Sequence, residues 1–508
     1  MALSWRRIWP LIAAFALLMV MVPTPAYGAG YLTDEDPLIA FNAGAPAASQ
    51  VRAIINSGEV VDGVLFAGIP DGVGIAPGEA GTAEVYVAHE ETTVPFFGSA
   101  DFQDASVTHL TLSTRPGMRG AVLHAEIAIS ADNGYLRFCS AAMVGPAEGF
   151  DDYVFWTGEE SNDIVDIQPG QPFTPDPSIT PQRQAGYAVA LNTDSGDFAH
   201  ITGMGRLNHE NTIALPDYRG IVLLTTDDTF SGPSAQLYMY TARNQDAVFN
   251  DTGRLMAFQV TGTQDGPVDP DDAFNGANDY LDLQPGDEFS GQFIRVPSRV
   301  ADGTLRNETP QGGLEDWSND NNIFQFIRLE DLAYDKNDPN VVYVADTGRT
   351  RVVPDATTGR LVRGPSGTDG FADNGRIFKM VFDPVDPTKV LSLTVFADGD
   401  APGSDVYVPM INPDNVDTSA NSLMVQEDSD DAQIWQYGFA SGVWTAIAHV
   451  TDPEGESSGI VDASPWYGPG TWLLTVQGHG VNIAEEQVGD VLFKRENGQL
   501  LLMRVPGS

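Results

Sequence analysis

The chain has 508 residues, with 26 Lys and Arg against 70 Asp and Glu, which gives a formal net charge of −44. A surface of this charge repels nucleic acid and anionic lipid, so we expect neither as a partner. A solvated acidic surface explains most of this charge, but converging carboxylates are also the ligands that calcium prefers. Cys139 is the single cysteine, which excludes an intrachain disulfide.

The first 28 residues have the layout of a secretory signal. Arg6 and Arg7 form a positive segment, an apolar run follows over 11–22, and small residues fit cleavage after Gly28. A membrane anchor is the alternative, but the run is shorter than the ~20 residues that cross a bilayer, and prolines follow it directly. We therefore expect a periplasmic or extracellular protein without stable membrane insertion.

After this segment, short apolar runs of strand length recur, separated by Gly, Pro, Asp and Asn. They are rich in β-branched and aromatic residues, and helical periodicity is hard to find. In chain order the clearest runs are 83–88, 186–191, 221–226, 236–241, 341–345, 376–382, 433–439 and 471–476. The sequence therefore predicts an all-β fold.

Several of these runs form pairs joined by a glycine-containing turn, as in 187–201, 434–448 and 491–502. Hairpins of this kind build the blades of a β-propeller, and no blade can bury both faces alone. We predict a single β-propeller domain of about six blades over 29–508, with long surface loops at 169–181 and 262–286. The repeat is degenerate, so an array of β-sandwiches is the alternative.

Five short polar segments lie at or near the ends of apolar runs, where strands can deliver side chains to a shared cavity. They are AHEE (88–91), TGEE (157–160), NHEN (208–211), RLED (328–331) and NPDN (412–415). One such segment alone is best explained as a surface loop. Five of them suggest carboxylates gathered around calcium or a transition metal, with Arg328 available to hold an anion.

Several motifs, taken in their order along the chain, make the sequence resemble the PhoX-type alkaline phosphatases and their phosphatase-like relatives. The resemblance rests on VAHE (87–90), FWTGEE (155–160), GRLNHEN (205–211), LLTTDD (223–228), FIRLEDLAYD (326–335), PNVVYVA (339–345), NPDN (412–415) and LMVQED (423–428). It implies a β-propeller with a metal cluster near its axis. In that family, iron and calcium position a phosphate ester for attack by a metal-activated oxygen.

Carried over by motif, the resemblance implies that Arg328 binds the phosphate. It also implies four metal ligands, Glu159, Glu210, Glu330 and Asp414, with Glu90 as a further candidate. Cys139 lies where iron-bearing members supply a thiolate, which suits iron, whereas an all-oxygen site suits calcium or magnesium. Away from this resemblance, Cys139 is a small buried hydrophobe, and both roles stay open. Gly158 is a departure, because many members carry a further cysteine there.

The roles of several neighbouring side chains also stay open. His89 and His209 precede glutamates and are either hydrogen-bond partners of metal ligands or structural residues. His479 ends a predicted strand, and a structural role is the better explanation. Asp228 and Asp428 also close strands. A solvated turn is the better explanation for Asp228 and only slightly the better one for Asp428.

The sequence and the resemblance together favour a secreted, monomeric, metal-dependent protein that hydrolyses phosphomonoesters, with calcium and, through Cys139, iron as cofactors. Motifs for a nucleophile elbow, a phosphate-binding glycine loop or a zinc-binding helix do not occur. A non-catalytic, calcium-stabilised propeller that binds a partner or a surface polymer is the main alternative. A different metal-dependent hydrolase, such as a phytase or lactonase, is the second, because fold does not determine substrate.

Overall fold

A computed structural model describes residues 30–166, 182–229, 235–304 and 309–508. The predicted signal segment and the loop predicted at 169–181 lie outside these residues. Within them the chain is almost entirely β-structure, as predicted, and helices are few and short: α1 (Gln245–Phe249), α2 (Ser298–Ala301), α3 (Pro310–Asp320) and α4 (Ser464–Tyr467). None of these helices is long and apolar enough to cross a membrane.

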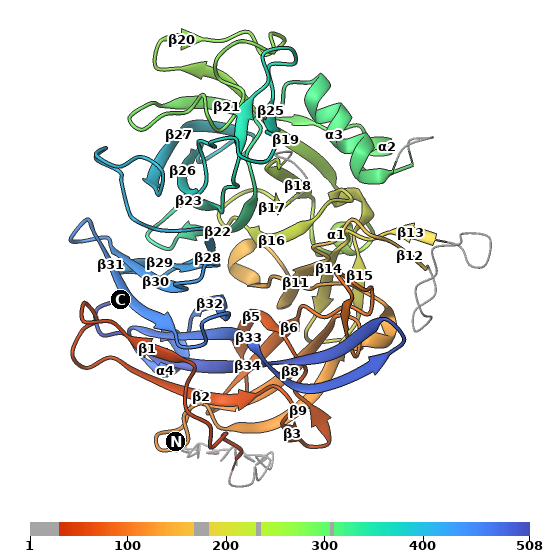
Figure 1. Ribbon diagram of the computed structural model, residues 1–508, viewed down its shortest axis with the longest axis vertical. Coiled ribbons are helices and arrows are strands. Elements are labelled where there is room, and N and C mark those ends of the chain that lie inside the picture. The colour runs from red at the N-terminus through yellow and green to blue at the C-terminus, as the bar shows by residue number, and fades with distance from the viewer. Residues whose placement is uncertain (1–29, 167–181, 230–234, 305–308) are drawn as a thin grey trace, which may run out of the picture.

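The described strands form six antiparallel blades around a central axis (Figure 1). The first three blades, with the innermost strand named first, are β5 (Pro70–Pro77), β6 (Thr82–His89), β8 (Ser106–Ser113) and β9 (Val122–Ile129); β10 (Ala142–Val144), β11 (Val154–Gly158), β14 (Ala188–Asn192) and β15 (Phe198–His200); and β16 (His209–Ala214), β17 (Ile221–Asp227), β18 (Tyr238–Ala242) and β19 (Arg254–Thr263).

The last three blades follow the same order from the axis outwards. They are β22 (Leu329–Asp335), β23 (Asp338–Asp346), β26 (Arg376–Phe382) and β27 (Lys389–Asp398); β28 (Pro413–Thr418), β29 (Ser422–Glu427), β30 (Gln433–Gly438) and β31 (Val443–Val450); and β32 (Glu456–Asp462), β33 (Thr471–Val488), β34 (Val491–Arg504) and β2 (Gln50–Asn56).

Short strands extend or connect these blades. Strand β21 (Phe289–Arg295) pairs with β19 and β27 and so joins the third blade to the fourth. Strand β7 (Ser99–Asp101) runs parallel to β34. The remaining pieces are β3 (Val60–Val61), β4 (Val64–Leu65), β12 (Ile164–Asp166), β13 (Gln182–Gln184), β20 (Gly266–Pro267), β24 (Val352–Pro354) and β25 (Leu361–Arg363).

The N-terminal strands close the ring by pairing with the end of the chain. Strand β1 (Ile39–Phe41) adds to the fifth blade beside β31, with Ile39 opposite Val450. Strand β2 completes the sixth blade beside β34. Two distant parts of the sequence therefore share the last two blades.

The core is divided into apolar layers between neighbouring blades. One layer packs the third blade against the fourth through Leu224 and Phe378, and another packs the sixth against the first through Leu473 and Val85. Equivalent layers lie between the other neighbours, so every blade buries both of its faces. This arrangement confirms the predicted six-bladed propeller and excludes an array of β-sandwiches.

Candidate metal centre at the propeller axis

The innermost strands of four blades share an irregularity at their start. In β5, β16, β22 and β28, the register with the second strand shifts directly after the first residue. The second residue of each strand is acidic: Asp71, Glu210, Glu330 and Asp414. Because a bulge re-aims a side chain out of the regular alternation, the four carboxylates can turn toward the axis instead of into a blade interface.

The second strands add further acidic groups at the same end of the propeller. Glu90 follows β6 directly, Glu160 follows β11 by two residues, and Asp428 follows β29 directly. Glu456 begins β32 of the sixth blade, and Cys139 precedes β10 of the second. Ligand side chains therefore come from all six blades, which is why no single stretch of sequence contains the site.

These side chains form four overlapping groups whose ligand atoms lie within 4.8 Å of one another. The groups are Asp71–Glu90–Cys139, Cys139–Glu160–Glu210, Glu210–Glu330–Asp414 and Asp414–Asp428–Glu456. We call these nine residues the acidic ring. Cys139, Glu210 and Asp414 each belong to two groups, so the groups form a continuous chain rather than isolated pairs.

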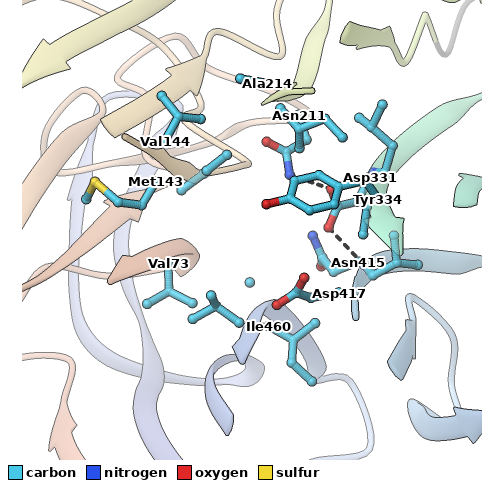
Figure 2. Close-up of a pocket in the computed structure, with 18 of the residues that line it drawn as sticks. Val73, Met143, Val144, Asn211, Ala214, Asp331, Tyr334, Asn415, Asp417 and Ile460 are labelled. Atoms are coloured by element: carbon cyan, nitrogen blue, oxygen red, sulfur yellow. Dashed lines mark hydrogen bonds between the residues drawn. The ribbon is translucent and has the colours of Figure 1, made fainter. Parts of the chain in front are cut away.

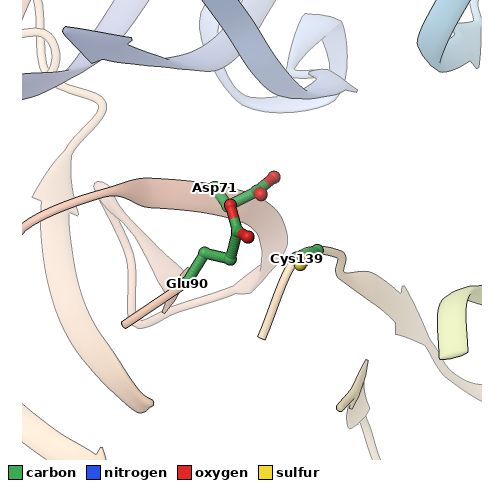
Figure 3. A group of neighbouring side chains, drawn as sticks. All are labelled: Asp71, Glu90 and Cys139. Atoms are coloured by element: carbon green, nitrogen blue, oxygen red, sulfur yellow. The ribbon is translucent and has the colours of Figure 1, made fainter. Parts of the chain in front are cut away.

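Figure 3 shows the first group, in which Asp71 and Glu90 approach each other beside Cys139. The Cys139 thiol is 5% exposed and donates a hydrogen bond of 2.8 Å to Oε2 of Glu160. Gln477 donates to Oδ2 of Asp71 at 2.9 Å. The Oδ1 atom of Asp71 is buried and has no hydrogen-bond partner among the described residues. A cation is the natural partner for such an oxygen.

Burial and mutual repulsion make this cluster costly without cations. Six ring carboxylates have a pKa far above the ordinary value, first because of burial and then because neighbouring carboxylates repel them. They are Asp71, Glu160, Glu210, Glu330, Asp414 and Glu456. Burial and the nearby Glu160 and Glu90 likewise raise the pKa of the Cys139 thiol. Bound cations would reverse both effects, since they favour the deprotonated form of each ligand.

Arg328 lies at the ring and is oriented by Asp228. Its Nε donates to Oδ1 of Asp228 at 2.8 Å and its Nη2 pairs with Oδ2, which is a two-pronged contact. The same Nη2 lies 3.2 Å from Oε1 of Glu330. Asp228 is fully buried, so the structure overturns its assignment to a solvated turn.

The structure places Glu160, and not the predicted Glu159, in the acidic ring. Glu159 is fully buried and points away from the ring, where Arg183 donates to both of its carboxylate oxygens at 2.7 and 2.9 Å. The backbone N–H groups of Leu136 and Tyr187 also donate to it. With its oxygens used in this way, Glu159 supports the loop that carries Cys139.

The other predicted site residues, Glu90, Cys139, Glu210, Glu330, Asp414 and Arg328, all lie at the ring. Asp71 and Glu456 were not among the predicted site residues, and Asp428, which is exposed as a solvated turn would be, also belongs to a ligand group. One signal was present for Asp71: Ile69-Pro70-Asp71 repeats the x-Pro-Asp pattern of Asn412-Pro413-Asp414, and both residues before proline have positive φ, 39° and 50°. Glu456 carries no comparable pattern.

His89 and His209 have structural positions. Both are fully buried, and each hydrogen-bonds a backbone carbonyl and a threonine hydroxyl rather than a ligand carboxylate. Burial lowers the pKa of each to about 4, so both are neutral. His479, by contrast, pairs with Glu496, and its Nε2 lies 3.7 Å from Oε1 of Glu456 of the ring.

Gly158 has a steric explanation. A Cβ atom at this position would lie 2.5 Å from Cβ of His209, across the contact between the second and third blades. This contact is too short for any side chain, so a second cysteine cannot occupy position 158 in this backbone. Cys139, the single cysteine of the sequence, is the one thiol that the chain can offer.

A separate cavity of about 140 Å³ lies further along the same inner strands (Figure 2). Its walls are apolar at Val73, Met143 and Ile460, and polar at Asn211, Asp331 and Asn415. Asp331 accepts hydrogen bonds from Asn211 and from the backbone N–H of Val416. These contacts tie neighbouring inner strands together directly behind the acidic ring.

Fold and site together define a class: a six-bladed propeller with an acidic, thiol-containing ring at one end of its axis. No known family profile and no curated protein matches the sequence. The structure is similar to that of Pseudomonas fluorescens PhoX in complex with vanadate, a transition state analogue, with a TM-score of 0.60 and 15% identity over 94% of this chain and 97% of that one. At this identity the similarity establishes a PhoX-like fold.

A second similarity, to a glycosyl hydrolase from Bacteroides ovatus, has a TM-score of 0.31 and 11% identity over 75% of this chain and 84% of that one. A similarity this low does not bear on fold or function.

Proposed function

We propose that this protein is an exported, monomeric phosphatase that hydrolyses phosphomonoesters at a cation cluster held by the acidic ring. The observation that carries the proposal is that Asp71, Cys139, Glu210 and Asp414 come from different blades into one ring, with Arg328 directly beside it. A phosphatase needs positive charge around a phosphoryl group, and cations on this ring together with Arg328 would provide it. The PhoX-like fold is consistent with the same chemistry.

The donor set fits hard cations, with one site that also fits iron. Carboxylates alone make up the groups Glu210–Glu330–Asp414 and Asp414–Asp428–Glu456, which suits calcium. The group Cys139–Glu160–Glu210 contains a thiol and suits iron. We assign as ligands the predicted residues Glu90, Cys139, Glu210, Glu330 and Asp414, with Glu160 in the place of Glu159, and we add Asp71, Asp428 and Glu456. Bound cations would neutralise charge on the phosphoryl group and activate an oxygen nucleophile.

Arg328 would bind and orient the phosphate. Asp228 holds the guanidinium by its Nε and Nη2 atoms, so the plane of the group is fixed before substrate arrives. A fixed guanidinium costs little rearrangement when charge develops on the phosphoryl oxygens. Asp228 is therefore a positioning residue, and its loss would leave the charge of Arg328 in place but its orientation free.

The first prediction concerns Arg328. Arg328→Ala is expected to lower kcat/KM for a generic phosphomonoester by about 10²–10³-fold, because one preorganised charged donor is lost. Arg328→Lys should restore only part of it, since lysine cannot reproduce the two-pronged contact with Asp228. Steady-state hydrolysis of p-nitrophenyl phosphate with saturating calcium measures both. Arg254→Ala, at an exposed position, is the matched control; unchanged kinetics in Arg328→Ala would refute the assigned role.

The second prediction concerns Cys139. Elemental analysis of the purified protein should find calcium together with stoichiometric iron, and Cys139→Ser should lose the iron while it keeps most of the calcium. The reason is that the thiol is the only soft ligand of the ring, whereas the carboxylates remain. Equal iron content in wild type and Cys139→Ser would show that the thiol is not a ligand.

A second candidate function is a calcium-stabilised propeller that binds a partner without catalysis. The observation that favours it is the contact at Gly158, which excludes a second thiol and so leaves the ring with fewer soft ligands than many PhoX-type proteins have. Calcium-dependent thermal stability without turnover of any phosphoester in a broad panel would support this candidate. Turnover that is abolished by chelation and restored by calcium would exclude it.

A further inference from the structure

A long insertion brings additional arginines to the rim of the acidic ring. It connects β23 to β26 in the fourth blade and contains the small hairpin β24–β25. Arg349 and Arg351 precede this hairpin, and Arg363 ends it. The insertion leaves β23 at Asp346, which is paired with Leu329 at the ring end of β22. Arg349 therefore follows the strand end beside Arg328 by three residues. Arg351 and Arg363 lie close to each other, since Val352 pairs with Arg363 and the N–H of Gly364 donates to the carbonyl of Arg351.

Hydrogen bonds fix the start of this insertion against the ring. The N–H of Thr347 donates to the carbonyl of Arg328 at 2.9 Å, and the N–H of Arg328 donates to the Asp346 carboxylate at 3.2 Å. On the other side, Nδ2 of Asn412 donates to the carbonyl of Thr347 at 2.7 Å. Asn412 is two residues before the ring residue Asp414. The segment that leads into Arg349 is thus held between the fourth and fifth blades at the ring.

Arg349 has no anionic partner in the described structure. The ion-paired arginines are Arg137, Arg183, Arg328 and Arg376. The Nε atom of Arg349 is buried without a hydrogen-bond partner among the described residues. Its pKa is lowered to about 10, first by burial and then by the charges of Arg328, Arg363 and Arg351.

This grouping runs against the composition of the chain. Acidic residues outnumber basic ones by 70 to 26, so an arginine can easily find a carboxylate. The charge of Asp228 raises the pKa of Arg349, but this carboxylate is already ion-paired with Arg328. Guanidinium groups that gather without carboxylates repel one another, and a bound anion with two or more oxygens removes this repulsion.

We propose that Arg349, supported by Arg351 and Arg363, binds a second anionic group of the substrate. The preferred substrate would then be a phosphomonoester whose leaving group carries another phosphate or a carboxylate. This inference rests on the proposed phosphatase function. One phosphoryl group would lie at the ring and Arg328, where the oxygen of a water molecule bonds to phosphorus as the ester P–O bond breaks, and one proton of that water ends on the leaving alcohol. The second anion stays on the departing alcohol and is held by Arg349.

Equilibrium binding of phosphonates tests this subsite without turnover, because the P–C bond is not hydrolysed. Calorimetry with calcium-loaded protein compares propane-1,3-diphosphonate with propylphosphonate, and the ethane and butane pairs cover other spacings. We expect wild type to bind the best diphosphonate at least about 10-fold more tightly than its monophosphonate partner, a free-energy difference of about 1.4 kcal/mol. Arg349→Gln should reduce this ratio to about 2, and Arg363→Gln should reduce it less.

Arg349→Lys is the second variant, and it should retain part of the ratio because it keeps the charge. Arg254→Gln serves as the control for an exposed arginine, and thermal melts verify that each variant is folded. An unchanged ratio in Arg349→Gln and in the double variant with Arg363→Gln would overturn the subsite. A ratio that depends on Arg349 in a protein without phosphatase activity would overturn the proposed function alone. Phosphatase activity with equal binding of both ligands would overturn the subsite alone.

Discussion

Glu160→Gln is expected to reduce the cation content of the purified protein and to lower phosphomonoester turnover by at least about 100-fold, whereas Glu159→Gln is expected to preserve both. Loss of a hydrogen-bond partner of a metal ligand commonly costs 10–100-fold in affinity or activity, so loss of a ligand should cost more. The two glutamates are adjacent in sequence, chemically identical and both buried. They differ in the direction of their carboxylates: that of Glu160 faces the ring, and that of Glu159 faces Arg183.

The expected phenotype of Glu159→Gln is lower stability. Its carboxylate neutralises Arg183 and accepts two backbone N–H groups, so the substitution leaves a buried guanidinium without its counter-charge. Breaking a buried ion pair in this way costs about 3–5 kcal/mol. We therefore expect a lower Tm in Glu159→Gln with calcium content and kcat close to wild type at 20 °C.

Elemental analysis, p-nitrophenyl phosphate kinetics and thermal melts on the two variants measure these effects together. Arg183→Gln is the matched control for the supporting contact, because it removes the partner of Glu159 and leaves Glu160 unchanged. The opposite pattern, with cation loss in Glu159→Gln and full activity in Glu160→Gln, would contradict the site as described.

Removal of the cations is expected to destabilise the protein strongly at pH 8 and only slightly at pH 5. We expect the Tm of calcium-loaded protein to exceed that of metal-free protein by about 10 °C at pH 8 and by less than about 3 °C at pH 5. The physical reason is the raised pKa of six ring carboxylates, of which Asp71, Glu160, Glu210 and Glu330 are buried.

The sign follows from proton binding in the two states. A group whose pKa is raised on folding contributes its full stability below the unfolded value, about 4 for a carboxyl, and loses it as the pH rises through the folded value. Metal-free protein should therefore lose stability steadily from about pH 5 upwards. Cations bind deprotonated ligands, so their contribution grows over the same range. The two effects act together to widen the Tm difference.

Metal-free protein for this experiment is prepared by chelation at pH 8 and then moved into chelator-free buffer, because chelators themselves bind calcium weakly at low pH. Glu330→Gln combined with Asp414→Asn removes two of the raised carboxylates, so the pH dependence of the metal-free form should become shallower. Asp265→Asn, in an exposed loop, should leave it as in wild type. A Tm difference that is constant between pH 5 and 8 would argue against a buried carboxylate cluster.

Several features of the site could be predicted from local sequence because the propeller repeats its geometry. Glu210, Glu330 and Asp414 lie at the same position of three inner strands, next to a polar residue and before an apolar run. Their motifs therefore look alike, and the resemblance to a known family rested on them. Glu90 was found for a related reason, since it directly follows a well-defined strand.

The choice between Glu159 and Glu160 could not be made in this way. Successive residues of a strand point to opposite faces, and Glu159 still bridges Phe138 after β11 ends at Gly158. Alternation therefore separates the two carboxylates but does not say which of them faces the ring. The direction of each carboxylate is then decided by contacts from elsewhere: Arg183 holds Glu159, and the Cys139 thiol donates to Glu160. These partners come from other segments of the second blade, and no pattern in the sequence around Glu159 and Glu160 predicts them.

By itself, the sequence determined that this is an acidic, all-β chain of propeller hairpins with carboxylates at the strand ends, because period-two patterning and turn residues act over short distances. Only the tertiary structure decided which side chains meet. Ring closure by β2 brings the sixth blade beside the first. The ligand contacts join neighbouring blades: Glu456 of the sixth blade meets Asp414 of the fifth, and Asp71 of the first meets Cys139 of the second. The tertiary structure also places the insertion with Arg349 beside Arg328. Side chains from six blades converge at the axis because a propeller directs every inner strand to the same end.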